Sequence, residues 1–443
     1  MDASLIPQFG GYLWTMLAFV VALSVIVAIH EYGHYIVGRW CGIKADVFSI
    51  GFGPVVASRV DRHGTRWQLA ALPLGGYVKF RGDANAASVG ADGTIAAMSE
   101  AERRQTMTGA TLWRRAATVA AGPAFNFILS IAVFAAFLLI GGRAAEAPVV
   151  GAPHDLPAEM VALEPGDEVL EIAGEPVSSL ADLVEVGARL DPAPTVPYAV
   201  RRDDARVEVD AMLPMPARVG TVQPRSPAWE AGLREGDVIT SVDGRPVWSF
   251  GALQADVAAS EGAPLALSVW RAGETLEFTL VARAQDLPLP GGGFERRWLL
   301  GVNGGLFFEP ATERAGPIEA LRYGVDQTAF ILTSSLSALG HIVTGAISTC
   351  NLSGPIGIAQ TSGAVASQGA SSFVWFIAVL SAAVGLLNLF PIPVLDGGHL
   401  AFYAWEAVTR RPPSDRAVRI LMTVGVALMG AMMAFALFND LTC

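Results

Sequence analysis

Charged residues are scarce in this sequence, and lysine is nearly absent. Asp, Glu, Lys and Arg make up 16% of the 443 residues, against about 25% in a typical soluble domain, and Lys44 and Lys79 are the only lysines. Hydrophobic residues make up 52%, and the mean hydropathy is +0.44. This composition excludes a disordered chain and argues against a purely soluble protein. The formal charge of −11 argues against a nucleic-acid partner, because binding to phosphates requires a basic surface.

Cysteine is scarce as well. The three cysteines, Cys41, Cys350 and Cys443, are odd in number and far apart in the chain, so no disulfide framework is indicated. Nothing in the sequence places Cys350 and Cys443 within bonding distance, and the roles of all three stay open.

Four apolar runs are long enough to cross a bilayer, which takes ~20 residues of helix. They cover residues 12–29, 117–140, 373–394 and 420–438. A fifth stretch, 326–348, has several polar residues between its apolar ones and is interpreted as an amphipathic helix on a surface rather than as a fifth span. The sequence therefore predicts a polytopic α-helical membrane protein with four transmembrane helices.

Charge is distributed unevenly between the segments that connect these runs. Residues 39–116 contain 11 Lys and Arg against 6 Asp and Glu, whereas residues 143–326 contain 15 against 29. The segment before the last run adds four arginines at 410–419. Because positively charged connecting segments stay in the cytoplasm, we expect residues 39–116 inside the cell. The acidic block and both termini are then expected outside.

The acidic block contains an internal repeat. Residues 163–177 match residues 233–247 at an offset of 70, each with a Gly-Asp turn, alternating apolar residues and a second turn. The second copy opens with Ser226-Pro-Ala-Trp-Glu-Ala-Gly, which is typical of a short capped helix. Both copies resemble PDZ domains, the first less closely. PDZ domains bind extended peptides at a sheet edge, but whether this pair binds peptides, filters by size or acts only as a spacer stays open.

The first apolar run leads into a His-Glu-x-x-His motif. His30 and His34 lie four residues apart, on one face of a helix, so both would bind a single metal ion. Glu31 lies beside them, where a general base would take a proton from the attacking water. Ionisable residues at membrane depth are costly and usually functional. The motif therefore predicts a catalytic metal centre of the zinc-protease type.

A catalytic zinc ion takes three protein ligands, so a third must come from elsewhere. The third apolar run leads into Asn388-Leu-Phe-Pro-Ile-Pro-Val-Leu-Asp-Gly-Gly-His399. Asp396 lies at the cytoplasmic end of its predicted span, at a depth similar to that of His30 and His34. We therefore prefer Asp396 as the third ligand, with His399 as its rival or as a supporting group.

The His-Glu-x-x-His motif, segment 388–398 and the PDZ-like pair together resemble the site-2 protease family of intramembrane zinc metalloproteases, as do segments 51–54, 73–79, 121–126 and 352–358. The resemblance implies a Zn²⁺ ion and the following site residues: His30, His34 and Asp396 as zinc ligands, Glu31 as catalytic base, and Asn388 and Pro393 as substrate contacts. It also implies an enzyme of the bacterial inner membrane. The expected substrate is a single-pass membrane protein already trimmed outside the cell, such as an anti-sigma factor or a signal-peptide remnant.

Residues 47–80 alternate apolar and polar side chains around an Asp61-Arg-His-Gly turn, which predicts a membrane-associated β-hairpin whose edge would hold an unwound substrate. The complete predicted organisation is an N-terminal membrane half (1–142, with spans 12–34 and 117–140), two α+β PDZ domains inserted between the second and third spans (147–215 and 216–284), a linker with the amphipathic helix (285–372), and a C-terminal membrane half (373–443).

Two other functions stay open on the sequence alone. A membrane-anchored PDZ scaffold with an inactive metal site would bind no zinc. A metal or proton transporter would distribute its polar residues over the full depth of several spans, whereas here they cluster at one end, which disfavours it.

Overall fold

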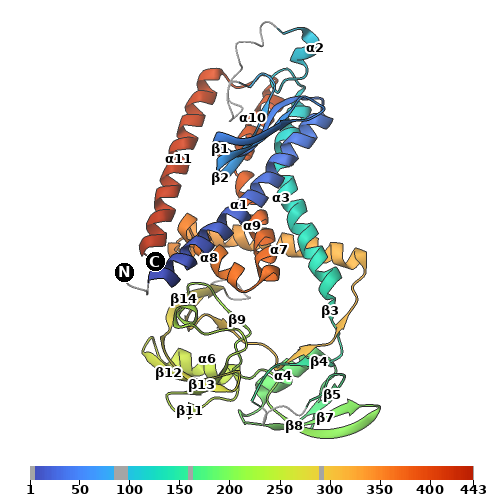
Figure 1. Ribbon diagram of the computed structural model, residues 1–443, viewed down its shortest axis with the longest axis vertical. Coiled ribbons are helices and arrows are strands. Elements are labelled where there is room, and N and C mark those ends of the chain that lie inside the picture. The colour runs from blue at the N-terminus through green and yellow to red at the C-terminus, as the bar shows by residue number, and fades with distance from the viewer. Residues whose placement is uncertain (1–4, 84–97, 158–162, 289–293, 443) are drawn as a thin grey trace. The chain divides into compact units, whose positions relative to one another are not determined.

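The computed structural model describes residues 5–83, 98–157, 163–288 and 294–442 (Figure 1). The chain divides into two compact units. We call the first the helical unit; it comprises Met1–Ala136, Pro317–Gly345 and Thr349–Cys443. The second, the repeat unit, comprises Phe137–Gly316 and Ala346–Ser348. Residues 158–162 of the first predicted PDZ domain and Cys443 lie outside the described residues.

The helical unit is built from long apolar helices. They and their shorter neighbours are α1 (Leu5–Trp40), α2 (Glu100–Arg103), α3 (Leu112–Gly141, whose last turn belongs to the repeat unit), α7 (Pro317–Val343), α8 (Pro355–Ser367), α9 (Ala370–Asn388), α10 (Asp396–Thr409) and α11 (Asp415–Thr442), with a 3₁₀ turn at Thr349–Asn351. Within the described residues, four helices are long and apolar enough to cross a membrane: Gly11–Trp40, Leu112–Gly141, Ala370–Asn388 and Arg416–Thr442. The prediction of four helices with the length and apolar composition of membrane spans is confirmed.

Two of the predicted boundaries were wrong. The third apolar run was predicted to extend to residue 394, but α9 ends at Asn388. Pro391 and Pro393 follow it, and because proline lacks a backbone N–H and disfavours helix in the residue before it, the helix stops there. The fifth stretch was predicted at 326–348, whereas α7 begins at Pro317 and ends at Val343. It is not among the four helices above.

Strands β1 (Ala45–Val60) and β2 (Arg66–Phe80) pair with each other, which confirms the prediction of strands at 47–80. The pair is more folded than a simple hairpin, because residues 47–50 pair both with 66–69 and with 76–79. Positive φ angles at Gly51 and Gly53 accompany this bend. The outer segments are thus 55–60 and 76–80. Phe48, Val78 and Phe80 are buried in one cluster with Tyr35 of α1.

The repeat unit contains two copies of one α+β arrangement. Its elements are β3 (Arg143–Ala144), β4 (Val150–Pro153), β5 (Glu168–Ile172), β6 (Glu175–Pro176), α4 (Leu180–Arg189), β7 (Val196–Arg202), β8 (Ala205–Ala211), β9 (Thr221–Val222), α5 (Pro227–Ala231), β10 (Val238–Val242), β11 (Arg245–Pro246), α6 (Phe250–Ala259), β12 (Pro264–Arg271), β13 (Glu274–Val281), β14 (Arg283–Pro288), β15 (Phe294–Leu299), β16 (Val302–Asn303), β17 (Phe308–Pro310) and β18 (Thr312–Glu313). The sheet orders β6-β5-β7-β8 and β11-β10-β12-β13 are equivalent.

The two copies share their internal contacts as well as their sheet order. In the first, the buried carboxylate of Asp167 pairs with Arg202 at 2.7 Å; in the second, Asp237 pairs with Arg271 at 2.6 Å. Each Asp also accepts a hydrogen bond from a backbone N–H three residues before it, which fixes the turn that precedes the first central strand. The repeat predicted at an offset of 70 residues is therefore confirmed at the level of structure.

Residues predicted to be a linker complete both copies. β16 pairs with β9 of the second copy, and β17 pairs with β4 at the start of the first. β18 then pairs with β3, with Thr312 opposite Ala144. The chain therefore leaves the repeat unit beside the point at which it entered.

Candidate metal centre

α1 presents the two histidines of the motif on one face. His30 is 9% exposed, and its Nε2 atom lies 3.2 Å from Nε2 of His34. Their rings meet edge to face, with centroids 4.8 Å apart. The spacing of four residues brings the rings together because one helical turn takes 3.6 residues.

Asp396 reaches the histidines from a different helix. It is the first residue of α10, directly after the non-helical residues 389–395. Gly397 and Gly398 follow it, and a Cβ at either would overlap the carbonyl groups of residues 389–392. Only glycine allows the chain to fold back this closely, so the Leu-Asp-Gly-Gly sequence positions the carboxylate as the helix begins.

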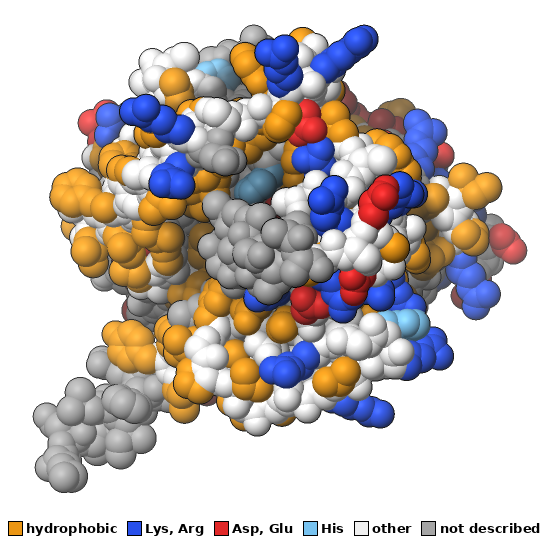
Figure 2. All heavy atoms as spheres, turned by 90° about the horizontal axis from the view of Figure 1, so that it is seen from above, with side chains coloured by type: hydrophobic (Ala, Val, Ile, Leu, Met, Phe, Trp, Pro, Cys, Tyr) orange, Lys and Arg blue, Asp and Glu red, His pale blue; other side chains and the backbone are white. Residues whose placement is uncertain are grey.

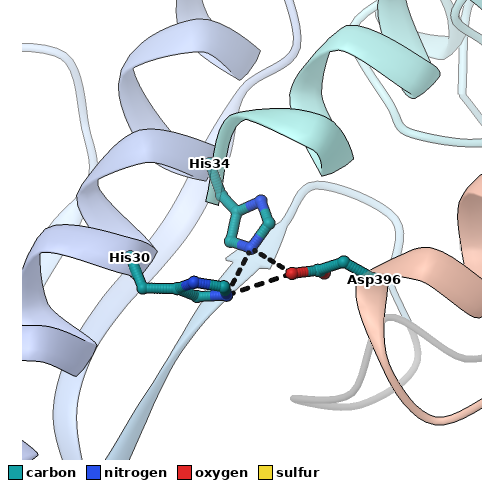
Figure 3. A group of neighbouring side chains, drawn as sticks. All are labelled: His30, His34 and Asp396. Carbon is teal, nitrogen blue, oxygen red and sulfur yellow. Dashed lines mark hydrogen bonds and ion pairs between the residues drawn. The ribbon is translucent and has the colours of Figure 1, made fainter. Parts of the chain in front are cut away.

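The three side chains form a compact triangle (Figure 3). Oδ2 of Asp396 lies 3.1 Å from Nε2 of His30 and 3.5 Å from Nε2 of His34. Ligand atoms about 2.0–2.1 Å from a tetrahedral zinc ion lie roughly 3.3 Å apart, so the triangle has the size of one face of such a site. Within the described chain, this is the one group of metal-binding side chains brought together in this way.

The donors also have the chemistry that a cation requires. Nδ1 of His34 lies 2.9 Å from the carbonyl oxygen of Thr118, which accepts its proton and leaves the lone pair on Nε2. A metal ion between this lone pair and the carboxylate oxygen of Asp396, which lies 3.5 Å away, would attract both atoms. Two nitrogens and one carboxylate oxygen match the ligand sets of catalytic zinc sites. The residues present therefore fit a zinc ion.

α3 forms the third wall of the centre. A Cβ at Gly122 would overlap Nε2 of His34 and would lie 2.8 Å from Nε2 of His30, so the missing side chain leaves the space between the donors free. One turn later, the side chain of Asn126 lies against His30, with Nδ2 3.2 Å from Nδ1. The only sign in the sequence of this contact with His30 was the presence of a polar residue, Asn126, inside an apolar run.

Glu31, on α1, lies next to outer segment 76–80 of the β1–β2 sheet, which we call the small sheet. A Cβ at Gly76 would lie 2.9 Å from Val27 and 3.3 Å from Cγ of Glu31, so this glycine allows β2 to approach α1 closely. The strand therefore runs directly past the predicted catalytic base, which places an extended backbone beside it.

Asp61 holds the other end of the sheet onto α1. Its carboxylate accepts hydrogen bonds from Tyr35, from the indole of Trp67 and from the backbone of His63 and Thr65. Burial alone would raise the pKa of Asp61, but these hydrogen bonds outweigh it and lower the pKa to about 2. Tyr35 follows His34 directly, so Asp61 connects the sheet to the helical turn that carries the motif.

The end of the molecule that carries α2 and α10 is rich in basic side chains. Figure 2, which views the structure from that end, shows Lys and Arg spread over the surface and a histidine side chain visible in a recess between them.

The remaining predicted residues take other positions. Asn388 ends α9, and its amide donates to the carbonyl of Val384 in the same helix. Pro393 packs near Gly425 of α11. Nδ1 of His399 lies 3.2 Å from the carbonyl of Leu395, and His399 does not belong to the metal-binding group. Cys41 is buried among apolar residues.

Comparisons with known proteins agree with this geometry. The model of peptidase family M50 matches residues 18–432. The chain is 36% identical over 428 residues to "Putative zinc metalloprotease Atu1380" of Agrobacterium fabrum, covering 96% of this chain and 94% of that protein. It is 34% identical over 459 residues to "Regulator of sigma-E protease RseP" of Salmonella typhimurium, covering 97% and 98%. A solution structure from Geobacillus thermodenitrificans covers 17% of this chain and 84% of its own at 28% identity, but its TM-score of 0.15 carries no argument.

These matches show that this membrane protein is a zinc metalloprotease. Since the family model spans most of its length, the chain belongs to peptidase family M50, the site-2 proteases. The resemblance that the sequence motifs indicated is therefore confirmed, and so is the dependence on zinc.

Proposed function

We propose that this protein is an intramembrane endopeptidase in which His30, His34 and Asp396 hold the catalytic zinc ion and Glu31 is the catalytic base. The observation that supports this most strongly is the triangle of donors, with sides of 3.1–3.5 Å, at the end of a helix long and apolar enough to cross a membrane. The chemistry supplied by bound zinc is polarisation of the scissile carbonyl and a lowered pKa of the attacking water.

Glu31 provides the proton transfers of the hydrolysis. As the water oxygen forms its bond to the carbonyl carbon, the Glu31 carboxylate takes the proton. It then donates this proton to the leaving amide nitrogen as the C–N bond breaks. The carboxylate returns to its ionised form, and one water is consumed for each peptide bond cleaved.

The substrate must be extended at the site, because a helical peptide bond is shielded by its own turn. The edge of the small sheet provides the template: a substrate strand would add to segment 76–80, which passes Glu31. Asn388 and Pro393 lie at and just beyond the end of α9, where Asn388 would turn its amide from Val384 to the extended substrate. Segment 55–60, which carries exposed Val55, Val56 and Val60, would lie in or on the membrane.

The proposed substrate is the transmembrane segment of a single-pass protein that has already lost its outer domain. An anti-sigma factor is favoured, because one relative is named for the regulation of sigma-E, and a signal-peptide remnant is the second substrate considered. The charge distribution supports a bacterial inner membrane with the active site toward the cytoplasm and the repeat unit and both termini outside. The two α+β copies are proposed to be PDZ domains.

The test is cleavage of a model single-pass substrate by purified protein in lipid vesicles. Glu31→Gln removes the base and keeps the ligands, so we expect unchanged zinc content and a loss of rate of at least ~10²-fold. His34→Ala should lose the zinc as well. Glu100→Gln, at an exposed glutamate of α2, is the matched control and should cleave normally. Wild-type rates from Glu31→Gln would refute the assignment.

A further inference from the structure

Asn126 lies completely buried at the back of the metal centre. Its exposed fraction is 0%, and two serines hold its backbone: Oγ of Ser130 and Oγ of Ser381 both donate to its carbonyl oxygen, at 3.1 and 3.0 Å. Gly385 of α9 packs against Asn126: a Cβ added at Gly385 would lie 3.1 Å from Cβ of Asn126. The side chain therefore has little freedom except rotation of its terminal amide.

The amide faces the nitrogen of His30 that points away from the metal position. Nδ2 lies 3.2 Å from Nδ1 of His30, while Oδ1 is buried without a hydrogen-bond partner. In this orientation Nδ1 is the acceptor, and the proton of a neutral imidazole lies on Nε2. That proton would point at Asp396 and His34 and would block ligation through Nε2.

The state that binds a metal requires the opposite tautomer. With the lone pair on Nε2, the proton lies on Nδ1, and two N–H groups would then face each other at 3.2 Å. A half turn of the amide removes this conflict, because Oδ1 takes the place of Nδ2 and accepts the proton of His30. The turn exchanges one buried unpaired atom for another, so its cost in hydrogen bonds is small.

We propose that Asn126 is a positioning residue whose amide oxygen accepts the Nδ1 proton of His30, which fixes the tautomer that binds zinc through Nε2. The inference rests on the proposed ligand role of His30. α3 then fixes the tautomer of both histidines in the same way. The Thr118 carbonyl accepts the Nδ1 proton of His34, and the Asn126 side chain accepts that of His30. Groups that accept from a metal-binding histidine orient the ring and raise its basicity, and their loss costs 10–100-fold in metal affinity.

The experiment measures zinc affinity of the full-length protein by competition with a chelator, together with the absorption spectrum of the Co²⁺ form. Asn126→Leu keeps the volume and removes the acceptor, and should bind zinc about 10–100-fold more weakly. Asn126→Asp keeps an acceptor and removes the donor, and should bind at least as tightly as the wild type with an unchanged Co²⁺ spectrum. Gly141→Ala, on the same helix and with nothing within 4 Å of the added Cβ, is the control and should leave the affinity unchanged.

Two results would overturn the proposal: wild-type affinity in Asn126→Leu, or an affinity in Asn126→Asp reduced tenfold or more. The second comparison decides the question even if the leucine variant does not fold, which the melting temperature of the metal-free protein reports. His30→Ala separates this inference from the ligand assignment. If that variant keeps its zinc, the assignment itself fails, whereas failure of the Asn126 variants alone leaves it standing.

Discussion

Gly122 shows how closely the metal centre is packed. Its Cα faces both metal-binding nitrogens from α3, and a methyl group there would overlap Nε2 of His34. Thus the absence of a side chain on one helix leaves room for a metal ion beside the proposed ligands of another.

We predict that Gly122→Ala abolishes zinc binding while the protein still folds. The added methyl group would occupy the space between the donors, and alanine is otherwise favourable in a helix. The measurement is the zinc content of the purified protein, with its melting temperature as a check on folding. Gly141→Ala is the matched control on the same helix, because nothing lies within 4 Å of its Cβ position. A Gly122→Ala variant with a full complement of zinc would contradict this geometry.

At the scale of single residues, the sequence predicted the proposed ligands but not their supports. His30, Glu31 and His34 follow from helical periodicity, and Asp396 from a carboxylate at a helix break. The carbonyl of Thr118 and the side chain of Asn126 lie 84 and 96 residues from the histidines they contact. No local pattern links residues this far apart, because the contact depends on how α3 packs against α1.

Between elements, the hydrogen bond of Asp61 with Tyr35 is a polar link between the small sheet and α1. The folded pKa of Asp61, about 2, lies below the ordinary value of 3.8, so the ionised form stabilises the folded protein. This contribution is fully present above about pH 4 and is lost as the pH falls toward 2.

We therefore predict that Asp61→Asn lowers the melting temperature at pH 7, by an amount corresponding to roughly 1–2 kcal/mol after allowance for solvent screening. The difference from the wild type should shrink as the pH is lowered from about 4 to 2. Asp46→Asn is the control in the same strand pair, because its contact with Arg81 is half-exposed and 3.4 Å long. A difference that stays constant with pH would show that the charge of Asp61 is not responsible.

The strands were predictable from alternation, whereas their folding onto each other was not. Residues 47–50 pair on both sides, which makes a small sheet rather than a two-stranded hairpin. The bend depends on Gly51 and Gly53 at positive φ, and a sequence shows only that glycine allows such a conformation, not that it adopts it.

For the whole molecule, the uneven charge predicts which segments lie on which side of the membrane. We expect a cysteine introduced at exposed Arg62 or Arg411 to be protected from a membrane-impermeant maleimide in intact cells. A cysteine at exposed Glu274 should be labelled. Labelling is compared with that of the parent protein, because native cysteines are present. Labelling of Arg62→Cys in unlysed cells would show that this segment lies outside and would contradict the proposed orientation.

The repeat unit is proposed to exclude substrates that still carry an outer domain. Because Thr312 pairs with Ala144, residues 145–311 can be removed and the ends joined by a short glycine linker. We predict that this deletion allows cleavage of an untrimmed substrate without changing the cleavage of a trimmed one. If the untrimmed substrate stays resistant while the trimmed one is cut, the repeat unit is not the filter.

The sequence by itself determined the number of helices long and apolar enough to cross a membrane, the presence of two repeats and the motif proposed to bind the metal. Each is a local or periodic property: the length of an apolar run, an offset of 70 residues, a spacing of one helical turn. Only the tertiary structure decided how α3 sets the two histidines, how the chain closes the repeat unit and where the small sheet meets Glu31. Those features depend on close packing between distant segments, where the absence of one methyl group at Gly122 or Gly76 decides whether two elements can touch.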